Sequence, residues 1–127
     1  MLIRSGVSFV GTNPDKTFPS PQGLLPGAGS MIAAVEAAAG KQPTIVGKPE
    51  TEIFQVALER MQIDPTEAVI VGDRIETDIV CGQRLNLQTA LVLSGVSTQG
   101  QADDHTPRID WIGKDLHTFL KTLLGQR

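Results

Sequence analysis

The fold of this chain is decided by the stretch Val69-Ile-Val-Gly-Asp-Arg-Ile-Glu-Thr-Asp78. Its apolar beginning predicts a strand over residues 68–71. Two aspartates, Asp73 and Asp78, follow this strand near the point where a helix is expected to begin. Parallel sheets place their sites at the carboxyl ends of strands, and Mg²⁺ needs few protein carboxylates beside a phosphate and water. The stretch therefore favours a metal site built on these two aspartates.

A lysine upstream extends this pattern. Lys48 precedes Pro49, which suits the first turn of a helix. The lysine ammonium group is a compact charge that suits phosphate oxygens and the charge that develops during phosphoryl transfer. Each residue also has an ordinary structural interpretation. Asp78 could cap a helix, Lys48 could be a solvated side chain, and Asp73 with Arg74 could form a turn.

The rest of the chain alternates strands with helices. Strands are predicted at residues 7–11, 44–47, 68–71, 89–93 and 109–112, and helices at 30–39, at 49–61, from about 77 onward and at 116–124. Two segments, 18–29 and 94–107, are expected to be irregular. The runs at 68–71 and 89–93 are continuously apolar, as strands covered on both faces are. The pattern predicts α/β architecture, a parallel sheet flanked by helices.

Composition narrows the functional classes. The chain has 127 residues, 40% of them hydrophobic and 20% charged, and a formal net charge of −3. The charges are intermixed without a basic block, so binding to nucleic acid or to a membrane surface is not expected. Cys81 is the only cysteine, which excludes an internal disulfide and favours a reducing compartment. The chain shows neither a charged-then-apolar leader nor a long apolar run, so we expect a cytoplasmic protein.

Several motifs occur together in an informative order. Gly47-Lys48-Pro49 precedes a predicted helix, and an apolar strand then ends in G-D-x-x-x-T-D. This combination resembles the haloacid dehalogenase (HAD) superfamily of Mg²⁺-dependent phosphatases. Three further segments resemble its p-nitrophenylphosphatase/NagD-like branch (subfamily IIA): Thr12-Asn13-Pro14-Asp15, Pro26-Gly27-Ala28-Gly29-Ser30 and Leu91-Val92-Leu93-Ser94-Gly95-Val96-Ser97. The chain resembles only the carboxy-terminal portion of the proteins in that branch.

The resemblance implies a division of the chain and a fold for each part. Residues 1–42 look like the last part of an α/β cap domain. Residues 43–127 look like the carboxy-terminal half of the Rossmann-like HAD core, a parallel sheet flanked by helices.

The resemblance also implies roles for individual residues. Lys48 matches the lysine that orients the phosphate. Asp73 matches the acidic Mg²⁺ ligand, and Asp78 matches the supporting acid next to it. Asn13 and Asp15 lie on the cap loop that faces the substrate. The implied reaction is hydrolysis of small-molecule phosphate monoesters through an aspartyl-phosphate, with Mg²⁺ as cofactor.

One required element does not occur in these residues. The family's nucleophile and general acid/base form a D-x-D pair, and the 127 residues contain none. Asp103-Asp104 is adjacent and is expected to be solvated surface in a polar loop. The two histidines, His105 and His117, lack a sequence neighbour that suggests a metal site and are interpreted as structural or solvated residues.

Two functional hypotheses follow. The first is a Mg²⁺-dependent HAD phosphatase whose nucleophile segment is absent from this chain, which alone is then expected to be inactive. The second is a non-catalytic fragment or pseudoenzyme that acts as an interaction module or is completed by a second chain. In the family's sheet the nucleophile strand pairs with the strand that matches Ala68–Val71. We therefore expect this strand to offer a bare edge to a second copy or to a complementary chain.

Overall fold

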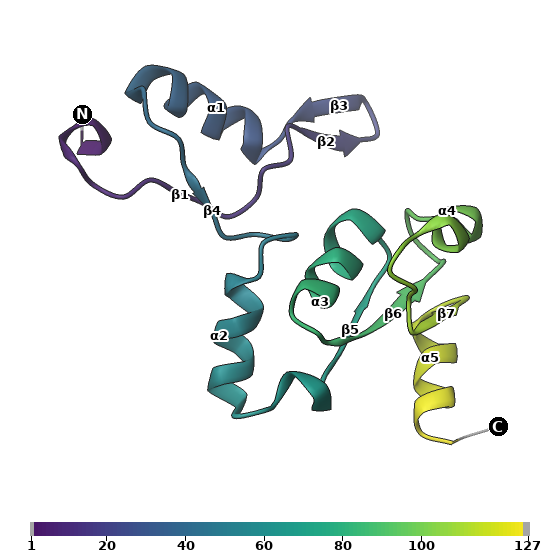
Figure 1. The fold of residues 1–127 in the computed structure, drawn as a ribbon. Coiled ribbons are helices and arrows are strands. Elements are labelled where there is room, and N and C mark those ends of the chain that lie inside the picture. The colour runs from purple at the N-terminus through teal and green to yellow at the C-terminus, as the bar shows by residue number, and fades with distance from the viewer. Residues whose placement is uncertain (1, 126–127) are drawn as a thin grey trace. The chain divides into compact units, whose positions relative to one another are not determined.

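The computed structural model describes residues 2–125, which form two compact units (Figure 1). The first runs as far as Ile53, and the second begins at Phe54. Each unit contains its own parallel strand pairing. The observed α/β architecture confirms the predicted fold class. The expected division into a cap part, residues 1–42, and a core part, residues 43–127, is a different division from these compact units, and it stays a prediction.

The first unit is built around two short parallel strands and one helix. Its elements are η1 (Leu2–Ser5), β1 (Val10–Gly11), β2 (Thr17–Ser20), β3 (Gly23–Pro26), α1 (Ala28–Ala39) and β4 (Thr44–Ile45). β1 and β4 pair in parallel, with Val10 opposite Thr44. α1 is rich in alanine, the best helix former, and it ends at Gly40, whose φ of 66° is left-handed. Both strands are shorter than the predicted 7–11 and 44–47.

The prediction of an irregular segment at 18–29 was wrong. β2 and β3 form an antiparallel hairpin in which Phe18 faces Leu25 and Pro19 faces Leu24. The hydroxyl of Ser20 donates to the carbonyl of Gly23 (2.8 Å), which closes the turn. Proline argued against a strand, but a two-stranded hairpin consists only of edge strands, where the missing N–H group is tolerated.

The second unit contains a three-stranded parallel sheet in the order β5-β6-β7 (Figure 1). The strands are β5 (Val69–Gly72), β6 (Gln88–Val92) and β7 (Trp111–Gly113). The helical elements are α2 (Glu52–Met61), which begins in the first unit, η2 (Pro65–Glu67), the π-helix η3 (Ile75–Ile79), α3 (Val80–Arg84), α4 (Gln99–Asp104) and α5 (Leu116–Leu123). β5 and β6 begin one residue from their predicted positions.

The core of the second unit consists of two buried clusters. One joins Ile75 and Ile79 of η3 to Leu91 of β6, with Ala102 and Ile109. The other contains Leu58, Ile70 and Leu87. Because η3 contributes two residues to the first cluster, burial fixes the segment that follows β5 against the sheet.

One loop prediction and the predicted start of one helix need correction, and a second helix start shifts by two residues. The segment 94–107 contains the helix α4, which Thr98 begins with a capping box shared with Gln101. Asp103 and Asp104 therefore lie in a helix and not in a loop. Pro49 precedes α2, which starts at Glu52, so it is not in the first turn. The helical segment after Asp73 starts at Ile75, two residues before Thr77, and begins as a π-helix.

Candidate active site

Asp73 is the residue directly after β5, and a neighbouring loop holds it. The backbone N–H of Val96 donates to its Oδ2 (2.9 Å). The backbone N–H of Ser97 donates to its carbonyl oxygen (2.9 Å). Val96 and Ser97 follow β6, the strand that pairs with β5. The carboxyl ends of two adjacent parallel strands thus meet around Asp73, and this is the edge at which parallel α/β sheets place their sites.

Asp78 lies within η3 and is 6% exposed. Its Oδ2 accepts a hydrogen bond from the backbone N–H of Arg74 (3.2 Å), the residue before η3. The carboxylate therefore satisfies an amide at the amino-terminal end of a helical element, although Asp78 lies within that element and Arg74, not Asp78, is the residue that precedes its first turn. Burial together with a hydrogen bond to a neighbouring amide fixes this side chain against the segment that begins with Asp73.

Two glycines make room for these carboxylates. A Cβ atom on Gly72 would lie 2.4 Å from Oδ2 of Asp78, and one on Gly95 would lie 2.0 Å from Oδ2 of Asp73. Any side chain at either position would occupy the space that the carboxylates use. The backbone therefore approaches both acids more closely than other residues allow.

The donor set fits a hard divalent cation. Asp73 and Asp78 supply carboxylate oxygens, which Mg²⁺ prefers, and Mg²⁺ retains several waters instead of needing a full protein cage. Among residues 2–125, no group of three or more His, Cys, Asp or Glu side chains could hold a metal ion. The two aspartates would therefore form part of a coordination sphere, with the remaining ligands coming from water, phosphate or another segment.

Lys48, Asn13 and Asp15 all belong to the first unit. β1 and β4 are parallel, and the N–H of Val46 donates to the carbonyl of Gly11 (2.9 Å), so the loops after both strands lie at the same edge. A Cβ on Gly47 would lie 2.0 Å from the carbonyl oxygen of Thr12. The loop that carries Lys48 thus packs directly against the loop that carries Asn13 and Asp15.

The loop at 12–15 is locally ordered. Oδ1 of Asn13 accepts a hydrogen bond from the N–H of Asp15 (2.7 Å), an Asx turn. The N–H of Gly29 donates to the carbonyl of Asp15 (2.8 Å). A Cβ on Gly29 would lie 2.1 Å from the carbonyl oxygen of Pro14. The glycines before and within α1 therefore let this loop rest on the start of the helix. The two segments 12–15 and 26–30, which are separate in the sequence, are thus in contact.

The structure thus forms two groups of predicted site residues. Asn13, Asp15 and Lys48 lie on adjoining loops of the first unit, and Asp73 and Asp78 lie at the end of β5 in the second. Sequence reasoning did not assign a role to the loop at 95–97. Two signals could have found it. The loop follows β6 as Asp73 follows β5, and it belongs to a segment, residues 91–97, that resembles the family.

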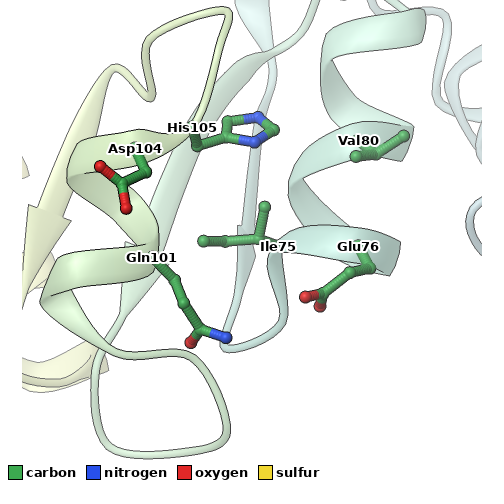
Figure 2. A pocket seen from close by; sticks show the side chains of 6 residues that line it. All are labelled: Ile75, Glu76, Val80, Gln101, Asp104 and His105. Carbon is green, nitrogen blue, oxygen red and sulfur yellow. The ribbon is translucent and has the colours of Figure 1, made fainter.

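A separate pocket of about 370 Å³ lies between η3, α3 and α4 (Figure 2). Its lining residues are Ile75, Glu76, Val80, Gln101, Asp104 and His105. The side-chain amide nitrogen of Gln83 donates to the carbonyl of Pro107 (2.9 Å), so the amide oxygen faces Nε2 of His105 (3.0 Å). This pairing places the imidazole proton on Nε2. His105 thus has a structural hydrogen bond at the end of α4.

The comparisons with known proteins decide the family. The HAD-hydrolase-like family matches residues 45–119, more than half of the chain. The chain belongs to this family.

The relatives extend that result. Acid sugar phosphatase from Staphylococcus haemolyticus is 32% identical over 123 residues, covering 97% of this chain and 47% of the relative. Ribonucleotide monophosphatase NagD from Escherichia coli K12 is 41% identical over 111 residues, covering 87% and 43%; its solved structure matches with a TM-score of 0.77. The structure of glycerol phosphate phosphatase Rv1692 from Mycobacterium tuberculosis in complex with magnesium has a TM-score of 0.78 at 39% identity, covering 91% of this chain and 35% of that one.

These matches confirm the resemblance to the NagD-like branch. The named relatives are phosphatases, and the chain spans a little less than half the length of the curated relatives it matches. In the described part of the chain, no helix is long and apolar enough to cross a membrane.

Proposed function

We propose that this chain contributes part of the active site of a Mg²⁺-dependent phosphatase that hydrolyses small phosphate monoesters. The observation that carries the proposal is the carboxylate pair at the end of β5, held by the Val96 and Arg74 amides, in a chain whose relatives are phosphatases. The names of those relatives specify a sugar phosphate, a ribonucleotide and a glycerol phosphate as substrates. A small phosphate ester with several hydroxyl groups is therefore the substrate class we assign.

Each residue has a distinct task in this proposal. Asp73 would hold Mg²⁺ and Asp78 would support it, because both present oxygen donors in fixed positions. Bound Mg²⁺ would neutralise charge on the phosphoryl oxygens. Lys48 would orient the phosphate. Asn13 and Asp15, on the loop beside Lys48, would contact the part of the substrate that differs between relatives.

The nucleophile is assigned to a segment outside these 127 residues. A phosphatase of this family needs an aspartate that attacks phosphorus, and the sequence contains no D-x-D pair. The place for that segment is the free edge of the sheet. Among the described residues β5 is hydrogen-bonded only to β6, so its other edge can accept a strand.

The alternative function, an interaction module, rests on the same edge. If a second copy pairs along β5, the chain forms an assembly without a nucleophile and has no phosphatase activity. The two proposals differ in what occupies the edge and in whether a complex turns substrate over.

The discriminating experiment is complementation. Hydrolysis of p-nitrophenyl phosphate is measured with Mg²⁺, with and without EDTA, for the chain alone and for the chain mixed with the part of E. coli NagD that it does not match. We expect no turnover by the chain alone and EDTA-sensitive turnover by the mixture, lost in Asp73→Asn and retained in the surface control Asp103→Asn. A complex that forms by light scattering yet stays inactive would favour the interaction module.

A further inference from the structure

We propose that residues 95–97, here called the 95–97 loop, act as a clamp that positions the carboxylate of Asp73. This inference rests on the proposed function, because it assigns a task to the loop within the same metal site. The loop lies within the residues that match the family, 45–119, but the roles implied for Lys48, Asp73 and Asp78 assign it no task.

The first observation is the set of hydrogen bonds between the loop and the segment after β5. The N–H of Val96 holds the Asp73 side chain at Oδ2 (2.9 Å), and the N–H of Ser97 holds its backbone carbonyl (2.9 Å). The hydroxyl oxygen of Ser97 accepts from the N–H of Ile75 (3.0 Å). The loop thus binds the side chain of residue 73, its backbone, and the backbone two residues later. Three contacts on one short segment restrict both the position and the rotation of the carboxylate.

The second observation is burial. Ser97 is 4% exposed and Ile75 is 6% exposed, so the hydrogen bond between them lies inside the protein. A buried N–H group without an acceptor is costly, and this makes the Ser97 hydroxyl oxygen hard to replace. Ile75 also packs in the cluster with Ile79 and Leu91. The clamp is therefore anchored in the core and not in a free surface loop.

The third observation is the need for glycine at position 95. A Cβ there would lie 2.0 Å from Oδ2 of Asp73 and 2.5 Å from its Cβ and Cγ. The φ of Gly95 lies outside the left-handed range, so backbone strain does not explain the glycine. The Cβ of Asp73 is fixed by the backbone and cannot rotate away. An alanine at 95 must therefore displace either the loop or the aspartate.

These contacts bear directly on metal binding by Asp73. A metal-binding carboxylate needs partners that fix its orientation, and removing such a partner typically lowers metal affinity by about 10- to 100-fold. Gly95 supplies space, Val96 supplies the amide, and Ser97 ties the loop to the core. All three are positioning residues, because they act on the metal site through Asp73.

The test compares matched substitutions in the 127-residue chain. Gly95→Ala is paired with Gly100→Ala, because a Cβ at Gly100 meets nothing within 4 Å. Ser97→Ala is paired with Ser94→Ala, an exposed serine three residues earlier. Two NMR measurements are made on each protein. The amide proton shift of Val96 reports the hydrogen bond to Asp73, with Asp73→Asn as reference, and Mn²⁺ line broadening at the amides of residues 73, 74 and 96 reports metal affinity.

We expect Gly95→Ala and Ser97→Ala to move the Val96 shift toward its value in Asp73→Asn. Both should weaken Mn²⁺ binding by about 10-fold or more, while Gly100→Ala and Ser94→Ala retain wild-type values. A purely structural role would lower the thermal midpoint and leave Mn²⁺ affinity of the folded protein unchanged, and that result would overturn the clamp.

Failure of the clamp and failure of the proposed function give different results. If Mn²⁺ causes no line broadening that depends on Asp73 in the wild-type protein, the metal role of Asp73 is wrong. In that case the clamp is still supported if Gly95→Ala and Ser97→Ala both move the Val96 amide shift toward its value in Asp73→Asn. If the Val96 shift responds to neither Gly95→Ala nor Asp73→Asn, the clamp is wrong whatever the metal does.

Discussion

Asp78 accepts a hydrogen bond from the backbone N–H of Arg74, four residues before it, across 3.2 Å. This contact joins the buried Asp78 to the half-buried residue that follows Asp73. The same carboxylate occupies the space that a side chain at Gly72 would need. Asp78 therefore shapes the turn between β5 and η3 whether or not a metal is bound.

The first prediction concerns the stability contributed by Asp78. Asp78→Ala should lower the free energy of unfolding by about 1–3 kcal/mol, because the partly buried Arg74 amide loses its acceptor. Urea denaturation measures the change. Asp103→Ala, on the exposed face of α4, should stay within about 0.5 kcal/mol of wild type. Equal unfolding free energies for the two variants would show that the Arg74 contact contributes nothing.

The second prediction concerns acid stability. Two hydrogen bonds from Thr66 lower the pKa of the Asp64 carboxyl, the larger effect coming from the Thr66 hydroxyl and the smaller from its backbone N–H. Two hydrogen bonds from Thr118 likewise lower the pKa of Asp115, here with the backbone N–H having the larger effect and the hydroxyl the smaller. A lowered folded-state pKa gives stability that is present above the unfolded-state pKa, about 3.9, and is lost as pH falls through the folded value.

The double variant Asp64→Asn/Asp115→Asn tests this directly. Asparagine also caps helices but does not titrate. We expect the thermal midpoint of wild type to exceed that of the double variant near pH 6, and the difference to shrink as pH falls below about 4. Asp103→Asn serves as the control for charge. A difference that stays constant down to pH 2 would contradict the role of these two carboxylates.

The third prediction concerns the free edge of β5. If the chain pairs along β5, light scattering after size-exclusion chromatography should show mass that rises with concentration, because an unpaired apolar edge is a template for another strand. Val69→Lys should reduce this association, whereas Val56→Lys, at an exposed position on α2, should not. A monomer in which the outward amides of β5 exchange rapidly with solvent would show that the edge remains unpaired.

The extent of sequence prediction differed between elements for physical reasons. β5 and β6 were predicted to within one residue because their apolar runs are long enough to stand out from their surroundings. The hairpin of β2 and β3 was missed because proline and glycine at 19, 23 and 26 are typical of loops. α4 was missed because six polar or small residues have no apolar periodicity, and its capping box lies within a segment assigned to a loop.

The same limits apply to the site. Asp73 and Asp78 could be selected because their spacing after a strand is a local pattern. The contacts of Val96 and Ser97 with Asp73 join residues more than twenty positions apart, and they depend on the register of β5 with β6. The packing of Gly47 on Thr12 likewise depends on the pairing of β1 with β4. Local patterns give candidate residues, whereas strand pairing decides their neighbours.

The fourth prediction concerns catalysis by the chain alone. The 127 residues should show negligible hydrolysis of p-nitrophenyl phosphate with Mg²⁺, because metal and Lys48 cannot replace an attacking aspartate. The assay uses repurified protein to remove contaminating phosphatases. Turnover that survives repurification and disappears in Asp73→Asn would place a nucleophile within these residues and contradict the assignment.

The central claim is that Asp73 forms part of a Mg²⁺ site, and a Mg²⁺ titration followed by backbone amide NMR tests it most directly. We expect binding with a dissociation constant in the millimolar range, about 4 kcal/mol or less, because only part of the coordination sphere comes from this chain. Shifts should concentrate at residues 73–78, vanish in Asp73→Asn and persist in Asp103→Asn. Shifts that persist unchanged in Asp73→Asn, or a micromolar dissociation constant, would contradict the account.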